Sequence, residues 1–148
     1  MYTLVDSNVI LDLVTNDPRW FDWSSESLTN AANESTLAIN PVIYAEISIG
    51  YRTIEEIEDL LPPEDFRRLD LPYEAAFLAG KAFLAYRRRG GKRAAPLPDF
   101  YIGAHAAVGG MRVLTRDPQR YRTYFPTVPL IAPGRVMMAI NPRATPQG

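Results

Sequence analysis

The chain of 148 residues contains no cysteine and a single histidine, His105. Without cysteine there is no disulfide bond, no thiolate zinc site and no cysteine nucleophile. With one imidazole, a metal site built from several histidines is excluded as well. Any metal ion bound by this chain must therefore be held by oxygen ligands, which are the ligands that Mg²⁺ and Mn²⁺ prefer.

Long apolar runs are also missing. No run approaches the roughly 18 residues that a membrane-spanning helix needs. The apolar start of the chain lacks a basic leader and is interrupted by Asp6 and Asp12, which argues against a signal peptide. We therefore expect one soluble, cytoplasmic domain with no membrane partner, and the lack of cysteine fits a reducing compartment.

Acidic residues are scarce in the second half of the chain. Residues 1–80 hold 15 Asp and Glu against 4 Lys and Arg, a net charge of −11, whereas residues 81–148 hold 2 against 12, a net charge of +10. A strongly basic half predicts a polyanionic partner such as nucleic acid. The two acids that remain there, Asp99 and Asp117, both follow turn signals. Their presence in an otherwise basic region suggests a functional role, and the alternative is that both simply cap helices.

Apolar runs typical of strands alternate with segments typical of helices. The expected strands are Tyr2–Val5, Thr36–Ile39, Phe66–Leu69, Arg112–Leu114 and Val128–Ile131. The expected helices are Ser7–Val14, Trp20–Asn33, Pro41–Gly50, Thr53–Leu61, Pro72–Arg89, Pro98–Gly109 and Asp117–Tyr124. Strands that alternate with helices predict an α/β fold with parallel strands joined by right-handed crossovers.

The longest expected helix carries two apolar stripes. One stripe contains Tyr73, Phe77, Gly80 and Leu84, and the other contains Ala75, Leu78, Ala82 and Tyr86. One stripe can face the sheet. The other predicts contact with a partner helix or a second subunit.

Four carboxylates are expected to meet at one edge of the sheet. Asp6 ends the first strand and Asp117 follows the fourth, and parallel strands place such positions at the same edge. Asp99 begins the helix that leads into the fourth strand, and Glu46 lies in the helix after the second strand. Two carboxylates about 4 Å apart repel each other by roughly 4 kcal/mol at an effective dielectric of 20, and a cation offsets this cost.

This arrangement predicts a metal site for phosphodiester hydrolysis. Mg²⁺ prefers oxygen ligands and keeps bound waters, one of which can become the nucleophile. Asp6 is the expected central ligand, beside Asp99 and Asp117, while Glu46 binds directly or through water and helps to remove the proton from that water. Two such ions would activate the water and stabilise the leaving oxygen.

Neighbouring polar residues are expected to support the carboxylates. Ser7, Asn8 and Thr115 can orient carboxylates or water. Taken singly, each acid has an ordinary explanation, since aspartate commonly caps helices and Glu46 can be a solvated helix residue. Their common placement favours the site. His105 lies off the face of Asp99 and is expected to be structural or exposed.

Basic residues surround the two late acids. Arg87, Arg88, Arg89, Lys92 and Arg93 precede Asp99, and Arg116 and Arg120 flank Asp117. We expect this run and Arg116 to bind nucleic-acid phosphates, the alternative being a solvated basic face. The nearby aromatic residues could stack on bases, but we favour a place in the core for them. These aromatic residues are Phe100, Tyr121 and Tyr124.

The acidic segments resemble the four motifs of PIN-domain ribonucleases. The resembling segments are Asp6-Ser7-Asn8, the helix Pro41–Gly50 with Ala45-Glu46-Ile47, Leu97–Ala106 around Asp99, and Leu114–Asp117 followed by Arg120–Phe125. They occur in the family's order between Met1 and Ala132. The pattern looks most like the VapC toxins of bacterial VapBC toxin–antitoxin pairs.

The resemblance implies a three-layer α/β/α sandwich around a parallel five-stranded sheet of order 3-2-1-4-5. Residues 1–132 would form the PIN domain, and residues 133–148 a partly mobile C-terminal extension. The implied activity is that of an endoribonuclease dependent on Mg²⁺, or Mn²⁺, with Asp6, Glu46, Asp99 and Asp117 as catalytic and metal-binding residues. The implied partners are RNA, a second copy of the chain in a homodimer, and an inhibitory VapB-type antitoxin.

Three other functions match part of the sequence. A phosphotransfer receiver domain would need paired acids after the first strand and a lysine after the fifth, but Ser7 follows Asp6 and no lysine follows Lys92. A haloacid-dehalogenase-type phosphatase would need a second aspartate where Asn8 stands. The non-enzymatic alternative is a PIN-like RNA-binding domain without metal, which the presence of all four acids argues against.

Overall fold

The computed structural model describes residues 1–134. Of the predicted C-terminal extension, residues 135–148 lie outside the described residues. The elements follow in this order: β1 (Tyr2–Val5), α1 (Ser7–Val14), α2 (Phe21–Glu34), β2 (Thr36–Ile39), α3 (Pro41–Ser48), α4 (Ile54–Leu60), β3 (Arg67–Arg68), α5 (Tyr73–Arg88), α6 (Pro98–Gly109), β4 (Arg112–Leu114), α7 (Gln119–Tyr124) and β5 (Leu130–Ile131). Each predicted element is present, although β3 and β5 are shorter than predicted because each pairs along one side only.

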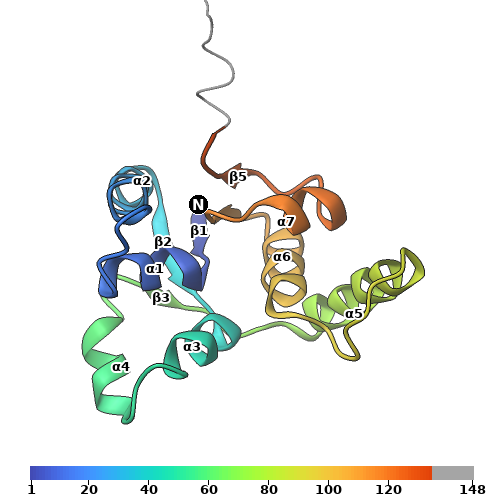
Figure 1. Cartoon of the computed structure of the whole chain (residues 1–148), viewed down its shortest axis with the longest axis horizontal. Helices are drawn as coiled ribbons and strands as arrows, with labels where there is room; N and C mark the ends of the chain where they lie inside the picture. Colours follow the sequence, from blue (N-terminus) through green and yellow to red (C-terminus); the bar gives the residue numbers. More distant parts are fainter. Residues whose placement is uncertain (135–148) are drawn as a thin grey trace, which may run out of the picture.

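The strands form one parallel sheet in the order β3-β2-β1-β4-β5, which confirms the predicted topology. β1 lies at its centre, where Thr3 is in register with Leu37 of β2 and Arg112 of β4. Helices flank the sheet in the predicted three-layer arrangement (Figure 1). Continuous apolar runs suit strands that are covered on both faces, and Leu4 and Val5 are fully buried.

The long helix α5 packs against α6 and extends away from the sheet (Figure 1). One side of α5 thus packs on a partner helix, as expected for one of its two stripes, whereas packing of the other stripe on the sheet is not observed within residues 1–134. The small side chains of Ala75 and Ala79 are buried in this contact region, since small residues let two helices approach closely. The other predicted stripe is exposed. Its exposed members are Tyr73, Phe77 and Leu84.

Helix α6 is held on two sides. Gly103 faces the ring of Phe125 so closely that an added Cβ would lie 2.3 Å from its Cδ2 atom, which ties α6 to the chain after α7. His105 is buried, and its Nδ1 accepts a hydrogen bond of 3.1 Å from Asn40. Asn40 also caps α3 by accepting from the backbone N–H of Ile43. The prediction that His105 is structural or exposed is therefore resolved in favour of structural, and burial lowers the pKa of this imidazole.

No helix among residues 1–134 combines the length and the apolar character that crossing a membrane requires.

Candidate active site

Asp6 directly follows β1, and its backbone N–H extends the ladder by donating to the carbonyl of Leu114. The carboxylate is buried. Its Oδ2 accepts hydrogen bonds of 2.9 Å from the hydroxyls of Thr115 and Tyr121, and a longer one of 3.5 Å from Asn8. Because three donors meet the same oxygen, the rotation of the carboxylate is fixed and Oδ1 is held in one direction.

Thr115 joins the ends of β1 and β4. Its hydroxyl donates to Asp6 and accepts from the side chain of Asn8 at 3.2 Å and from the backbone N–H of Asp117 at 3.0 Å. Ser7 makes a similar link on the other side, where its hydroxyl donates to Oε1 of Glu46 at 2.9 Å. The three residues predicted to orient carboxylates thus all contact a carboxylate or the loop that carries one, while their effect on catalysis stays a prediction.

The carboxylates influence one another's ionisation. Burial, and then the negative charges of Asp99 and Glu46, raise the pKa of Asp6 from its ordinary value of 3.8 to about 7, against the opposing effect of its hydroxyl hydrogen bonds. Burial and the charge of Asp99 likewise raise the pKa of Glu46. Burial and the charge of Asp117 raise the pKa of Asp99. Asp6, Glu46 and Asp99 are therefore coupled electrostatically, and the charge of Asp117 acts on Asp99.

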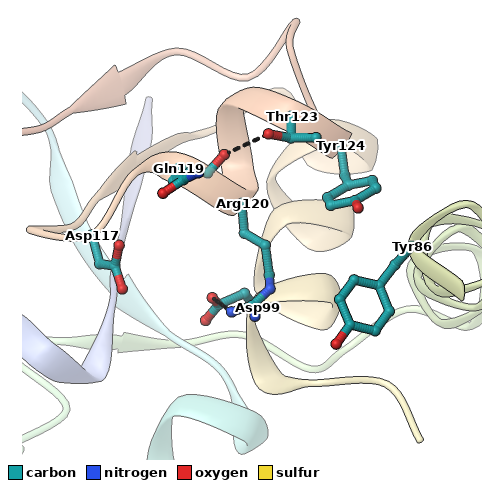
Figure 2. A pocket seen from close by; sticks show the side chains of 7 residues that line it. All are labelled: Tyr86, Asp99, Asp117, Gln119, Arg120, Thr123 and Tyr124. Carbon is teal, nitrogen blue, oxygen red and sulfur yellow. Dashed lines mark hydrogen bonds and ion pairs between the residues drawn. The ribbon is translucent and has the colours of Figure 1, made fainter. Parts of the chain in front are cut away.

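A cavity of about 430 Å³ opens beside Asp99. Its lining residues are Tyr86, Asp99, Asp117, Gln119, Arg120, Thr123 and Tyr124 (Figure 2). Arg120 Nη1 donates to Asp99 Oδ2 at 3.3 Å, and the guanidinium carbon lies 5.9 Å from the ring centroid of Tyr86. This ion pair lowers the pKa of Asp99, opposing the effect of burial. The cavity therefore presents both an acidic wall and one basic side chain.

The side chain of Arg116 is only partly exposed and contacts other residues of the chain. Its Nε atom forms an ion pair of 2.9 Å with Asp12, whose carboxylate is buried and accepts from the hydroxyl of Ser24 at 2.7 Å. Its guanidinium carbon also lies 5.6 Å from the ring centroid of Trp20. Through this ion pair Arg116 anchors the loop that carries Thr115 and Asp117. Its predicted role in RNA binding stays a prediction.

Three residues that support the site were not predicted from the sequence. Asn40 links α3 to α6, Asp12 anchors Arg116, and Tyr121 donates to Asp6. Tyr121 is fully buried, as expected for a core aromatic residue, but its hydroxyl also reaches the carboxylate. No local pattern marks these contacts, because each joins elements that are distant in sequence.

Replacing Tyr121 by phenylalanine should remove one hydrogen bond to Asp6 without changing the shape of the core. We expect Tyr121→Phe to lose about 1–3 kcal/mol of unfolding free energy, since the lost bond involves a charged acceptor. Urea denaturation at pH 8 measures the loss. Tyr124→Phe is the matched control on the same helix, and an equal change in both variants would contradict the role given to the Tyr121 hydroxyl.

The acids fit a Mg²⁺ or Mn²⁺ ion in kind, since all are oxygen donors whose repulsion a cation would relieve. Their present positions are not those of a completed site. Among residues 1–134, no three His, Asp or Glu side chains are grouped closely enough to hold a metal ion. Arg120 supplies a positive charge to Asp99 instead.

Comparison with known proteins agrees with this fold. The family model of the PIN domain matches residues 3–126. No curated protein matches the chain. Among solved structures, VapBC2 from Rickettsia felis bound to a DNA fragment from its promoter has a TM-score of 0.69 and 18% identity, over 89% of this chain and 98% of that one.

Two further structures are similar over the same shares of both chains, 89% and 98%, at 18% identity. VapBC-1 from nontypeable Haemophilus influenzae has a TM-score of 0.67, and a toxin–antitoxin complex from Klebsiella pneumoniae has one of 0.59. At this level of identity the likeness concerns the fold.

Proposed function

Because the chain belongs to the PIN-domain family, we propose that it is a metal-dependent endoribonuclease and the toxin of a VapBC-type toxin–antitoxin pair. The observation that carries the proposal is the convergence of Asp6, which follows β1, with Glu46 of α3 and Asp99 of α6, whose negative charges raise the pKa of Asp6. The similar structures, which are VapBC or other toxin–antitoxin complexes, support the toxin assignment.

In this proposal Asp6, Asp99 and Asp117 hold Mg²⁺ or Mn²⁺, with Glu46 beside them. When bound, such an ion supplies Lewis acidity and lowers the pKa of a water for in-line attack at phosphorus. Ser7 donates to Oε1 of Glu46, so Oε2 is the atom that would be left to hold a proton from an attacking water. Thr115 and Tyr121 keep Asp6 in one orientation throughout.

Cleavage of single-stranded RNA by the purified chain tests the proposal. We expect cleavage with Mg²⁺ or Mn²⁺, none with EDTA, and recovery when excess metal is restored. Sequencing the RNA ends would identify the class of RNA and the cleaved sequence. Intact RNA in every metal tested would contradict the proposed function.

The basic run at the end of α5 is proposed to bind RNA, together with Lys92. Arg89 lies over the ring of Tyr124 at 5.3 Å from its centroid, so the run borders the cavity that Tyr124 lines. Arg87 Nη1 donates to the carbonyl of Arg93 and thereby shapes the following loop. Positive charge at this rim can attract the phosphates of an RNA strand that enters the cavity.

Replacing Arg87, Arg88 and Arg89 by alanine should weaken RNA binding more than it slows cleavage. Counterion release predicts that the slope of log affinity against log salt shrinks by about 0.7 for each lost contact with single-stranded RNA. Binding is measured across a salt series in an Asp99→Asn background, which prevents cutting. If the run only complements the dipole of α5, the slope stays unchanged and stability falls slightly.

Two partners belong to the proposal. A homodimer is supported by the exposed apolar stripe of α5, where Tyr73 and Phe77 are 93% and 68% exposed, since such stripes mark contact surfaces. A VapB-type antitoxin would place an arginine or lysine in the acidic pocket. A second candidate function, RNA binding without metal, is favoured by one observation, the Arg120–Asp99 ion pair.

A further inference from the structure

Arg120 and Asp99 form a weak pair inside the cavity. One N–H of the guanidinium meets one carboxylate oxygen at 3.3 Å, and the two side chains are 40% and 25% exposed. Exposed pairs with a single contact contribute little to stability. Arg120 and Asp99 can therefore separate readily when either of them meets a stronger binding partner.

Each member has a better partner in the proposed reaction. A carboxylate among other carboxylates gains more from a divalent ion than from a partly exposed guanidinium. A guanidinium has five N–H donors in a planar fork that matches the oxygens of a phosphate. The ring of Tyr86 lies near the guanidinium (Figure 2) and can support it when it leaves Asp99.

We propose that the cavity beside Asp99 is a subsite for an RNA phosphate, that Arg120 is its binding group, and that Asp99 releases Arg120 to the phosphate when it takes up the metal ion. The proposal rests on the proposed nuclease function. Arg120 then has two opposite roles: in the RNA-free chain it competes with the metal for Asp99, and in the substrate complex it binds RNA.

The exchange couples the two binding events. RNA that engages Arg120 removes the competitor of the metal, so RNA tightens metal binding. By thermodynamic reciprocity, the metal tightens RNA binding by the same factor. A residue with a merely structural role in α7 would weaken both events or neither.

Titration of Mn²⁺ into the RNA-free protein tests whether Arg120 competes with the metal ion for Asp99. Arg120→Gln should bind Mn²⁺ about threefold to fivefold more tightly than wild type, because its competitor is gone. Arg122→Gln is the matched control, since it removes the same charge from an exposed position on the same helix. Arg120→Lys, which keeps the charge, should stay close to wild type in calorimetry.

Binding of a short single-stranded RNA tests whether Arg120 binds an RNA phosphate. In an Asp99→Asn background the RNA is not cut and Arg120 is no longer held by a carboxylate. There Arg120→Gln should weaken RNA binding about threefold to tenfold, as expected for one charged phosphate contact. Arg122→Gln should weaken it less, and Arg120→Lys should lie between.

The outcomes separate the two proposals. If wild type neither binds Mn²⁺ nor cleaves RNA, the nuclease function fails and the exchange fails with it. If wild type does both, but Arg120→Gln does not bind Mn²⁺ more tightly than Arg122→Gln, only the exchange is overturned. If Arg120→Gln leaves the RNA affinity unchanged in the Asp99→Asn background, the proposed phosphate subsite is overturned. Thermal unfolding of each variant shows whether a lost affinity reflects a lost fold.

Discussion

Asp6→Asn is expected to reduce RNA cleavage at saturating Mg²⁺ by at least about a hundredfold, more than the loss of a group that only orients a ligand. The fold should remain intact, because the amide oxygen can still accept from Thr115 and Tyr121 in place of Oδ2. The amide NH₂ then takes the place of Oδ1. It offers a donor without charge where a metal ion needs a charged acceptor.

The same loss is expected for Asp99→Asn, whereas Asp59→Asn is the control for a general change of charge, since Asp59 is exposed on α4. Cleavage rates are measured across Mg²⁺ concentrations, together with thermal unfolding of each variant. A wild-type rate in Asp6→Asn at saturating metal would overturn the assignment of the site.

In the absence of metal, Asp6→Asn is expected to be more stable than wild type at pH 8. Burial and neighbouring charges raise the pKa of Asp6 from 3.8 to about 7 in the folded state. Between these values the folded chain keeps a proton that the unfolded chain has released. This contribution to stability is fully present below about pH 4 and is lost as the pH rises through 7.

The size of the effect follows from linkage. Each pKa unit corresponds to about 1.4 kcal/mol, so ionisation of Asp6 costs on the order of 1–4 kcal/mol at pH 8. Asparagine has no such cost. Its neutral side chain also removes a negative charge that raises the pKa of a neighbour, the Tyr121 hydroxyl.

Urea denaturation in EDTA at pH 5 and pH 8 measures this difference. Wild type should lose more stability between the two pH values than Asp6→Asn does. Acids with lowered pKa values, such as Asp17 and Glu58, act in the opposite direction but are common to both proteins. Added Mg²⁺ should raise the stability of wild type at pH 8 more than that of the variant. Equal pH dependence in the two proteins would contradict the expected cost.

Much of the fold could be predicted from the sequence because its signals are local. The apolar run Tyr2–Val5 and the turn at Asp6 determine the first strand and its end, and parallel pairing then places Asp117 at the same edge. At the start of α4, Thr53 and Glu56 form a capping box, whose residues lie only three positions apart in the sequence. Ser7 and Thr115 could be placed at the site in the same way, because they lie next to or near an acid in the sequence.

Other parts of the site depend on side-chain directions that no local pattern reports. The side chain of Arg116 turns to the buried Asp12, whereas that of Arg120 turns to Asp99, although both are arginines beside the same turn. Tyr121 lies on α7, and its hydroxyl reaches Asp6 across 115 positions of the sequence. The packing of α5 on α6 likewise involves small alanines, and alanines in a helix do not indicate from the sequence which element they will contact.

The hydrogen bond between Asp6 and Thr115 joins residues 109 positions apart. During synthesis from the N-terminus, β1 is made well before β4, which pairs with its second side. Long-range pairings of this kind form late in folding. A nascent chain that ends before residue 99 contains the Asp6 and Glu46 carboxylates but lacks Asp99, Thr115, Asp117 and Tyr121. The order of translation thus delays assembly of the acidic site until synthesis has passed residue 121.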